Sequence, residues 1–571
     1  MKKFLPDLIA ILAFIILSFA YFFPADIEGR ILFQHDTAAG VGAGQESKEY
    51  LERTGERTRW TNSIFGGMPT YQMSPSYDST TSLKGVEKVY RLFLPDYVVL
   101  TFIMMLGFYI LLRAFGISAW LAGLGGVIWA FSSYFFILIP AGHIWKFVTL
   151  AYIPPTIAGV VLAYRKKYLL GGIVTALFIA LQIQSNHIQM SYYFMFVILF
   201  FVGAYFEDAY KKKELPHFFK ASGVLALAAV VGVCINISNL YHTYEYSKET
   251  MRGKSELKQE GAAASQTSSG LDRDYITNWS YGIGETLTLL VPNVKGGGSG
   301  STMSQSEAAM AKANPMYNGI YSQLPQYFGE QPWTAGPVYV GAFVMFLFVL
   351  GCFIVKGPLK WALLGATIFS ILLSWGKNFM GLTDFFIDYV PMYNKFRAVS
   401  SILVIAEFTI PLLAIFALKE ILSKPDMLKQ EKNCRGVIAA LVLTAGVALI
   451  LAVAPGTFFS SFITTQEMTA LKQALPAEHL APFVANLTEM REAIIASDAW
   501  RSFFIIVIGC LFLFLYQLRK LKASFTLAGV ALLCLIDMWS VNKRYLNDEQ
   551  FVPKSKRSEA FVKTQADEII L

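Results

Sequence analysis

Charged residues and cysteines are scarce in this sequence, and the motifs of nucleotide-driven chemistry are absent from it. Only 15% of the 571 residues are charged, whereas soluble domains carry about a quarter. The five cysteines form no CxxC pair and no even framework, and they lie in or beside apolar segments, so we interpret them as packing residues. No P-loop, no dinucleotide-type GxGxxG and no GxSxG elbow occurs, which leaves nucleotide-driven transport and serine hydrolysis without support.

Apolar residues are abundant instead, and they are gathered in long runs. Hydrophobic residues make up 55% of the chain, and the mean hydropathy is +0.47. The runs are about 20 residues long, which is enough to cross ~30 Å of hydrocarbon. They cover residues 4–23, 96–112, 118–140, 146–164, 168–186, 188–206, 218–240, 337–355, 359–375, 399–418, 436–455, 502–518 and 524–541. The sequence therefore predicts an all-α polytopic membrane protein with about thirteen transmembrane helices.

The basic residues predict the orientation of these helices. We interpret the first run as an uncleaved helix and place Lys2 and Lys3 inside the cell. The short basic loops then all fall on that same side, at Arg113, 165–167, 211–213, Lys356 with Lys360, 419–435 and 519–522. This agreement with the positive-inside bias predicts a cytoplasmic N-terminus and an outer C-terminus. Because the net charge of +8 arises from these loops, it does not indicate binding of nucleic acid.

Four segments are then expected outside: 24–95, 241–336, 376–398 and 456–501. Together with the helices they form one membrane domain, 1–541, followed by an outer C-terminal segment, 542–571. The glycine-rich stretch 296–300 and the Ser/Ala/Gln-rich residues up to about 313 predict a flexible insertion. Within 456–501, the leucine spacing predicts an amphipathic helix that lies at the interface or on the other outer loops.

The first outer segment carries a histidine and a carboxylate, His35 and Asp36, shortly after the first helix. An acid just above the membrane, near arginines and aromatic residues, suits general-base work on a polar acceptor. The alternative is that Asp36 caps a surface helix beginning at Thr37.

Four of the six histidines, His35, His143, His187 and His242, fall at the predicted outer ends of helices. With Asp36 and Glu245 as oxygen ligands they could hold a divalent metal ion, although their spacing matches no zinc motif. Hydrogen bonding at the interface is the alternative.

Basic residues also occur where the positive-inside bias does not place them. Lys395 and Arg397 directly precede a helix that begins on the outer side, so the helix-end N–H groups would add to their positive potential. This pattern predicts a phosphate or pyrophosphate site, and snorkelling of the two side chains to the interface is the alternative.

Two outer stretches, around Glu245 and around Glu330, combine acids with aromatic residues, as saccharide sites do, and either could be an ordinary loop. Inside the membrane the acids are Glu407 and Asp537. An intramembrane acid is a functional hypothesis by default, although Glu407 could also bond a neighbouring helix.

These motifs, taken in their order along the chain, resemble the bacterial YfhO-type membrane proteins, with the Bacteroidetes branch most similar. That family belongs to the GT-C class of glycosyltransferases. The resemblance covers nearly the whole chain and rests on His35-Asp36, Trp60 with Phe65–Pro69, Ala141–Lys146, Gln184–Gln189, Thr243–Ser247, Gly329-Glu330 and Asn394–Arg397.

The resemblance implies a GT-C-like fold in a bacterial inner membrane. It also implies transfer of a sugar from a polyprenyl-phosphate donor to a glycan or lipid acceptor of the cell envelope. Asp36 with His35 would be catalytic, and Arg397 with Lys395 would bind the donor phosphate. Trp60, His143, Lys146, His187, Glu245 and Glu330 would bind substrate. The family's members continue into a further outer domain, so we expect 542–571 to begin such a domain.

Two other functions share this topology. A transporter or flippase for a lipid-linked glycan should show repeated halves and helices broken near mid-membrane. The sequence has no clear internal repeat, and Pro154-Pro155 interrupts one helix only. A non-catalytic envelope-assembly protein would need none of the outer acids.

Overall fold

The computed structural model describes residues 4–73, 75, 77–253, 270–556 and 564–570. Most of these residues are helical. The helices are α1 (Leu5–Phe22), α2 (His35–Ala43), α3 (Gln45–Thr54), α4 (Thr81–Tyr90), α5 (Val98–Ala114), α6 (Ala119–Ala130), α7 (Ser133–Leu138), α8 (Ile144–Tyr164), α9 (Tyr168–Gln184), α10 (Ile188–Lys212), α11 (Leu215–Cys234), α12 (Ile237–Ser247), α13 (Arg273–Thr277), α14 (Glu307–Met310), α15 (Asn318–Tyr321), α16 (Ala342–Ile354), α17 (Pro358–Ser374), α18 (Met380–Tyr389), α19 (Val404–Ser423), α20 (Glu431–Leu441), α21 (Val447–Val453), α22 (Thr465–Ala474), α23 (Ala477–Gln517), α24 (Ala523–Asn542) and α26 (Gln565–Ile570). Two antiparallel pairs of short strands join β1 (Ile31–Leu32) to β4 (Phe551–Val552) and β2 (Trp60–Thr61) to β3 (Met68–Pro69).

The structure agrees with the prediction of a multi-pass helical membrane protein. Among the described residues, eight helices are long and apolar enough to cross a membrane, or nine if the bent pair α17 and α18 counts as one span. The other predicted runs correspond to the shorter apolar helices α5, α6, α9 and α16. Each predicted run thus lies on a helix, although these four are shorter than a usual span.

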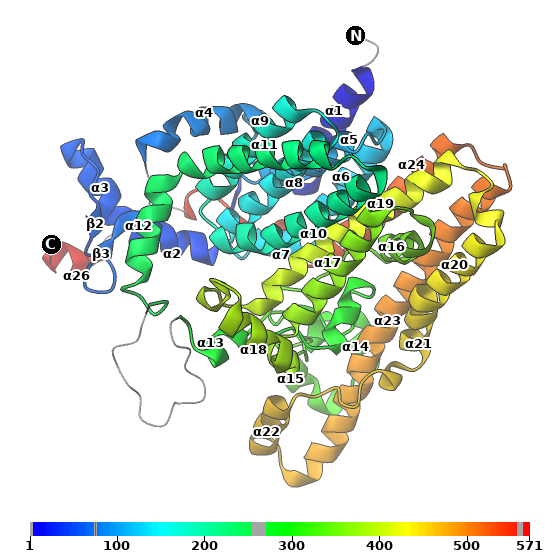
Figure 1. Cartoon of the computed structure of the whole chain (residues 1–571). Coiled ribbons are helices and arrows are strands. Elements are labelled where there is room, and N and C mark those ends of the chain that lie inside the picture. Colours follow the sequence, from blue (N-terminus) through cyan, green and yellow to red (C-terminus); the bar gives the residue numbers. More distant parts are fainter. Residues whose placement is uncertain (1–3, 74, 76, 254–269, 557–563, 571) are drawn as a thin grey trace.

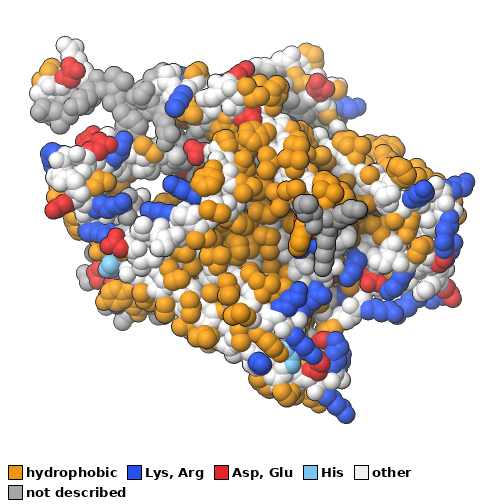
Figure 2. All heavy atoms as spheres, turned by 90° about the horizontal axis from the view of Figure 1, so that it is seen from above, with side chains coloured by type: hydrophobic (Ala, Val, Ile, Leu, Met, Phe, Trp, Pro, Cys, Tyr) orange, Lys and Arg blue, Asp and Glu red, His pale blue; other side chains and the backbone are white. Residues whose placement is uncertain are grey.

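The helices form one bundle (Figure 1), and their side chains give it a buried centre and an apolar surface. The spans of α8 and α19 are 94% buried within the protein, whereas those of α1 and α11 are only 28% buried. The peripheral helices turn large apolar side chains such as Leu8, Leu169 and Leu227 outward. Figure 2 shows the result, a broad apolar face with Lys and Arg gathered towards its edges. A surface of this kind is suited to lipid and not to water.

One span ends in a sharp bend. The helix axis turns by 110° between α17 and α18. At the bend Gly376 has a φ of +45°, and a Cβ there would lie 2.1 Å from the hydroxyl oxygen of Ser280. Only glycine allows both this conformation and this close approach. The bend leaves α18 lying across the end of the bundle, and the chain then returns to the start of α19.

Residues 296–313 are packed against other parts of the protein, so the prediction of a flexible insertion there was wrong. Gly296, Gly297 and Gly298 are buried, and Cβ atoms at Gly296 and Gly298 would lie 2.0 Å from the Gln326 carbonyl oxygen and 2.7 Å from that of Ala335. These glycines are therefore required by close backbone packing.

The amphipathic helix predicted in 456–501 is present as α22 and the first part of α23. Leu471 and Leu487 pack with residues of 303–321 in a second hydrophobic core, so this helix does lie on another outer loop. It continues without a break into the last-but-one membrane helix, because α23 is a single helix of 41 residues.

The segment that follows α1 pairs with the segment that follows α24. β1 pairs with β4, the Tyr21 hydroxyl donates to the Leu546 carbonyl at 2.8 Å, and Arg30 forms a 2.6 Å ion pair with Asp548. The connection that leads from α1 to α2 is thereby fixed from both ends.

Candidate functional site

Asp36 and His143 form the centre of the candidate site. Asp36 lies in the first turn of α2, and His143 is the residue before α8. The Nε2 atom of His143 lies 3.1 Å from a carboxylate oxygen of Asp36, and both side chains are about half exposed. α2 begins at His35 with Gln34 before it, so Asp36 is not the capping residue of the helix.

The backbone before α8 brings these two residues together. Gly142 has a φ of +82°, and a Cβ on it would lie 3.1 Å from the Cβ of Asp36. Gln34 donates from its side-chain amide to the Ile139 carbonyl at 2.6 Å. The start of α2 is therefore docked directly on the turn between α7 and α8.

The surroundings hold His143 in its neutral form. Burial lowers the pKa of His143 from its ordinary value, and the positive charges of Lys146 and Arg397 lower it further, against the opposing effect of Asp36. A neutral imidazole that donates Nε2–H to Asp36 orients that carboxylate.

Two cations lie on the inner side of this pair. The ammonium of Lys146, in the first turn of α8, donates to the Ser401 hydroxyl at 3.0 Å and lies 5.0 Å above the Tyr134 ring. Arg397 donates to the Tyr275 hydroxyl at 2.7 Å, and its guanidinium lies 6.0 Å from the centre of the Trp279 ring. The positive charges of both residues lower the pKa of His143, and the bond from Lys146 to Ser401 joins the start of α8 to the turn that follows Arg397.

The ends of three helices add to this positive potential. α8 and α10 begin at Ile144 and Ile188, and the 3-10 turn Val399–Leu403 opens the α19 span. Gln189, in the first turn of α10, donates to the Arg397 carbonyl at 2.8 Å. Since the free N–H groups of a helix lie at its N-terminus, these starts favour an anion here.

Glu407 lies beneath this cluster and is fully buried in α19. One of its oxygens accepts from the Ser132 hydroxyl at 2.8 Å, at the break between α6 and α7. The expected bond to a neighbouring helix is thus present. Asp537 accepts from the Tyr339 hydroxyl and forms a 2.6 Å ion pair with Arg501, so it ties α24 to α23 and the start of α16.

Lys395 does not join Arg397. Its ammonium donates to the Arg252 carbonyl at 2.7 Å, and the Arg252 guanidinium donates to the Lys395 carbonyl at 3.0 Å. The two residues bind the 250–253 turn to the loop before α19. Lys395 therefore stabilises the loop before α19.

The other predicted site residues are spread over the outer segments. His187, before α10, is close enough for Lys146 and His143 to affect it, and burial together with these neighbours lowers its pKa to about 3. Trp60 is exposed in β2 and lies against Gly67, and Glu245 pairs with Lys248 at 2.7 Å. Glu330 is exposed, and its carbonyl accepts from Lys377 at 3.4 Å. The side chain of His35 lies outside what the structure describes.

The histidines are not gathered around a metal ion. His242 is sandwiched between the rings of Tyr71 and Tyr77, and its Nδ1 lies 3.1 Å from the Tyr77 hydroxyl. Among the residues that the structure describes, no three His, Cys, Asp or Glu side chains lie close enough together to hold a metal ion.

Comparison with known proteins gives no relative. No protein-family model, no curated protein and no solved structure matches this chain. The chemistry of the site therefore has to be argued from its own geometry.

Sequence reasoning missed the aromatic side of the site. Tyr275 lies in α13 and Trp279 lies two residues beyond its end, and Arg397 lies over both rings. Gln189 and Ser401, which contact Arg397 and Lys146, gave no signal of their own.

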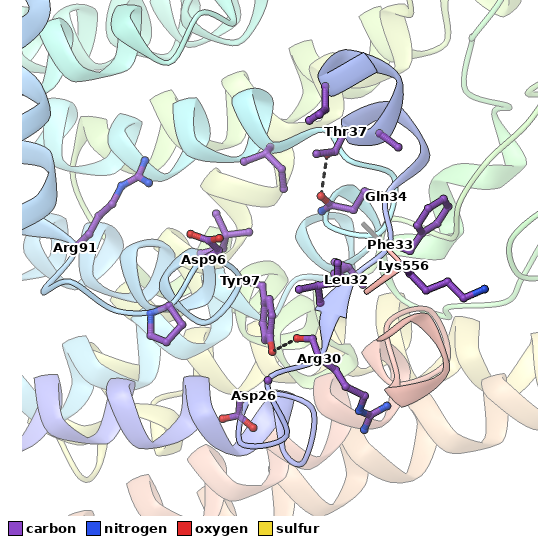
Figure 3. A pocket seen from close by; sticks show the side chains of 17 residues that line it. Asp26, Arg30, Leu32, Phe33, Gln34, Thr37, Arg91, Asp96, Tyr97 and Lys556 are labelled. Atoms are coloured by element: carbon purple, nitrogen blue, oxygen red, sulfur yellow. Dashed lines mark hydrogen bonds between the residues drawn. The ribbon is translucent and has the colours of Figure 1, made fainter. Parts of the chain in front are cut away.

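A pocket of about 460 Å³ lies beside the site but does not contain Asp36 (Figure 3). It is lined from α2 by Thr37, Ala38 and Val41, which lie on one face of the helix, and by Gln34 just before the helix. Asp36 lies about 200° around the helix from Ala38, on the opposite face. Therefore α2 separates this pocket from the Asp36–His143 pair.

Proposed function

We propose that this chain is a membrane glycosyltransferase of the GT-C type, which moves a sugar from a polyprenyl-phosphate donor to a hydroxyl of an envelope acceptor. One observation carries the proposal: the Asp36–His143 pair lies at the start of α8, and hydrogen bonds from Lys146 to Ser401 and from Gln189 to the Arg397 carbonyl join this start to those of α10 and the α19 span. A base and an anion site side by side at the end of a membrane bundle are what such a transfer needs.

The reaction would use these groups as follows. Asp36 takes the proton from the acceptor hydroxyl while that oxygen attacks the anomeric carbon of the sugar. The bond from the anomeric carbon to the phosphate oxygen breaks, and the electron pair leaves with the lipid phosphate. Arg397 and Lys146, together with the helix N-termini, stabilise that departing charge. His143 is a positioning residue, because it orients the Asp36 carboxylate through Nε2.

The test is Asp36→Asn, which keeps the size of the side chain and removes its basicity. Turnover of a polyprenyl-phosphate sugar by purified protein, read as released polyprenyl phosphate, should fall by roughly 10²-fold or more, with donor binding retained. Asp96→Asn is the matched control, because Asp96 lines the pocket on the other face of α2. Equal turnover by Asp36→Asn and Asp96→Asn would refute the assignment of the base.

A transporter for a lipid-linked glycan is the second candidate, and the bend between α17 and α18 favours it. Broken helices are typical of transporter sites, but those sites lie near mid-membrane, and here α18 lies next to the loop that carries Arg397. Binding of the donor without any release of polyprenyl phosphate, with several acceptors offered, would support the transporter.

A further inference from the structure

A second, apolar groove lies on the lipid-facing surface between α10 and α17. Its volume is about 510 Å³, and almost all of its lining is aromatic or small. Gly203 and Ala204 contribute small residues from α10, Trp361 and Phe369 lie on α17, and Phe386 comes from α18.

The groove follows the helices through much of their length. On α10 its lining extends from Phe196 to Glu207, which corresponds to about 16 Å along the axis. On the other side it extends from Pro358 at the start of α17 to Phe369, and then to Phe386. Because α10 and α17 run in opposite directions, Phe196 and Phe386 mark one end of the groove, and Glu207 and Pro358 mark the other.

The end at Phe386 leads to the loop of Arg397. The Phe386 ring packs on Tyr393 at 5.4 Å, and the Tyr192 ring contacts both Phe196 and Phe396, at 5.4 Å and 5.1 Å. Arg397 directly follows Phe396, so the aromatic residues at the end of the groove belong to the same loop as the cation.

We infer that this groove holds the isoprenoid chain of the donor lipid whose phosphate binds Arg397; the inference rests on the proposed function. A polyprenyl phosphate is an anion on a long apolar chain, so its site must join a cation at the membrane surface to an apolar path along the helices. The groove and Arg397 are joined in this way. The bend after α17 places Phe386 at the junction, where its ring contacts the rings of Phe196 and Tyr393.

The chain itself provides a matched pair of variants. Gly203 lies in the groove and Gly223 lies on α11 outside it, both are exposed glycines of membrane helices, and a Cβ at either position would meet nothing within 4 Å. Gly203→Phe therefore fills the groove without a clash in the protein, and Gly223→Phe adds the same side chain elsewhere.

The experiment measures binding of undecaprenyl phosphate and of geranyl phosphate to the full chain in nanodiscs. Wild type should prefer the long chain. Gly203→Phe should lose this preference, with long-chain affinity reduced roughly tenfold through lost packing contacts, and geranyl phosphate binding should be unchanged. Gly223→Phe should bind both lipids like wild type. Equal thermal unfolding of the two variants verifies that both are folded.

Failure of the inference differs from failure of the proposed function. If wild type binds the long chain and Arg397→Ala weakens that binding, but Gly203→Phe matches Gly223→Phe, then only bulk lipid covers the groove and the inference is wrong. If wild type binds neither lipid, the donor class is wrong and the inference falls with it.

Discussion

Replacing Arg397 by alanine is expected to weaken the binding of polyprenyl phosphate far more than replacing Lys395. The two residues are neighbours in sequence, and both precede the α19 span. In the structure, however, the Arg397 guanidinium is held over Tyr275 and Trp279, within reach of the His143 site, whereas the Lys395 ammonium is bonded to the Arg252 carbonyl.

The size of the effect follows from the contact that is lost. A hydrogen bond to a charged group contributes about 1.5–3 kcal/mol, and each 1.4 kcal/mol is about tenfold in affinity. Arg397→Ala should therefore raise the dissociation constant of polyprenyl phosphate by about 10- to 150-fold. Arg397→Lys should recover part of this loss, because it restores the charge without the planar fork.

Lys395→Ala should change the affinity by no more than about threefold. What it loses is the bond from its ammonium to the Arg252 carbonyl, which stabilises the loop and does not contact the phosphate in the proposed site. Titration of the purified variants with polyprenyl phosphate, by native mass spectrometry or calorimetry, measures both effects. Wild-type affinity in Arg397→Ala, or an equal loss in Lys395→Ala, would refute the placement of the phosphate.

Three further outcomes follow from the structure. Gly296→Ala should lower the free energy of unfolding by about 1–3 kcal/mol through overpacking and its positive φ, and Gly300→Ala, which meets nothing within 4 Å, should leave it nearly unchanged in the same denaturation assay. Arg491→Met should lower the free energy of unfolding by about 3–5 kcal/mol, because the fully buried guanidinium forms two 2.7 Å bonds to Glu467. Undiminished protease resistance of α22 and the first part of α23 would contradict this. Since the folded pKa of His187 is about 3 and the unfolded value is near 6.5, its stabilising contribution is complete above pH 6.5. Below pH 6.5 the free energy of unfolding falls by up to about 1.4 kcal/mol per pH unit towards pH 3. His187→Asn should remove this contribution to the difference between unfolding free energies measured at pH 7 and pH 5.

The helices could be predicted from the sequence because hydrophobic length is a local property. A run of apolar residues must become helical in hydrocarbon to satisfy its own backbone, so the runs found the helices without any knowledge of tertiary contacts. The same reasoning could not find the bend after Ser374. That bend depends on the contact of Gly376 with Ser280, a residue from a distant outer segment.

The sequence singled out residues of the candidate site only where a residue was unusual in its own local surroundings. Arg397 was singled out as a cation at a predicted outer helix start, and Asp36 as an acid just beyond the first membrane helix, near arginines and aromatic residues. Their partners come from other helices, and nothing near His143 in sequence indicates its contact with Asp36. Lys395 was grouped with Arg397 because the two are close in sequence. Their side chains have different partners, however: Lys395 donates to the Arg252 carbonyl and Arg397 to the Tyr275 hydroxyl. These partners come from distant parts of the chain, so the sequence around the two residues does not reveal them.

Composition was misleading at the glycines. A run such as 296–300 resembles a linker when only residue types are counted. In the structure the absence of side chains allows backbone from 326 and 335 to approach closely. Whether such glycines form a flexible linker or a packed turn depends on the backbone that lies opposite them. The residues near the glycines in sequence do not specify that backbone.

The pairing of β1 with β4 sets an order of assembly for the protein. Chains are synthesised at about 5–20 residues per second, so Phe551 is made from about half a minute to nearly two minutes after Leu32, its partner. Throughout that interval Arg30 has no Asp548 to bind. The helix that carries Asp36 is therefore fixed on both sides only after α24 has entered the membrane. Until then a nascent chain holds its earlier membrane helices without the β1–β4 pair.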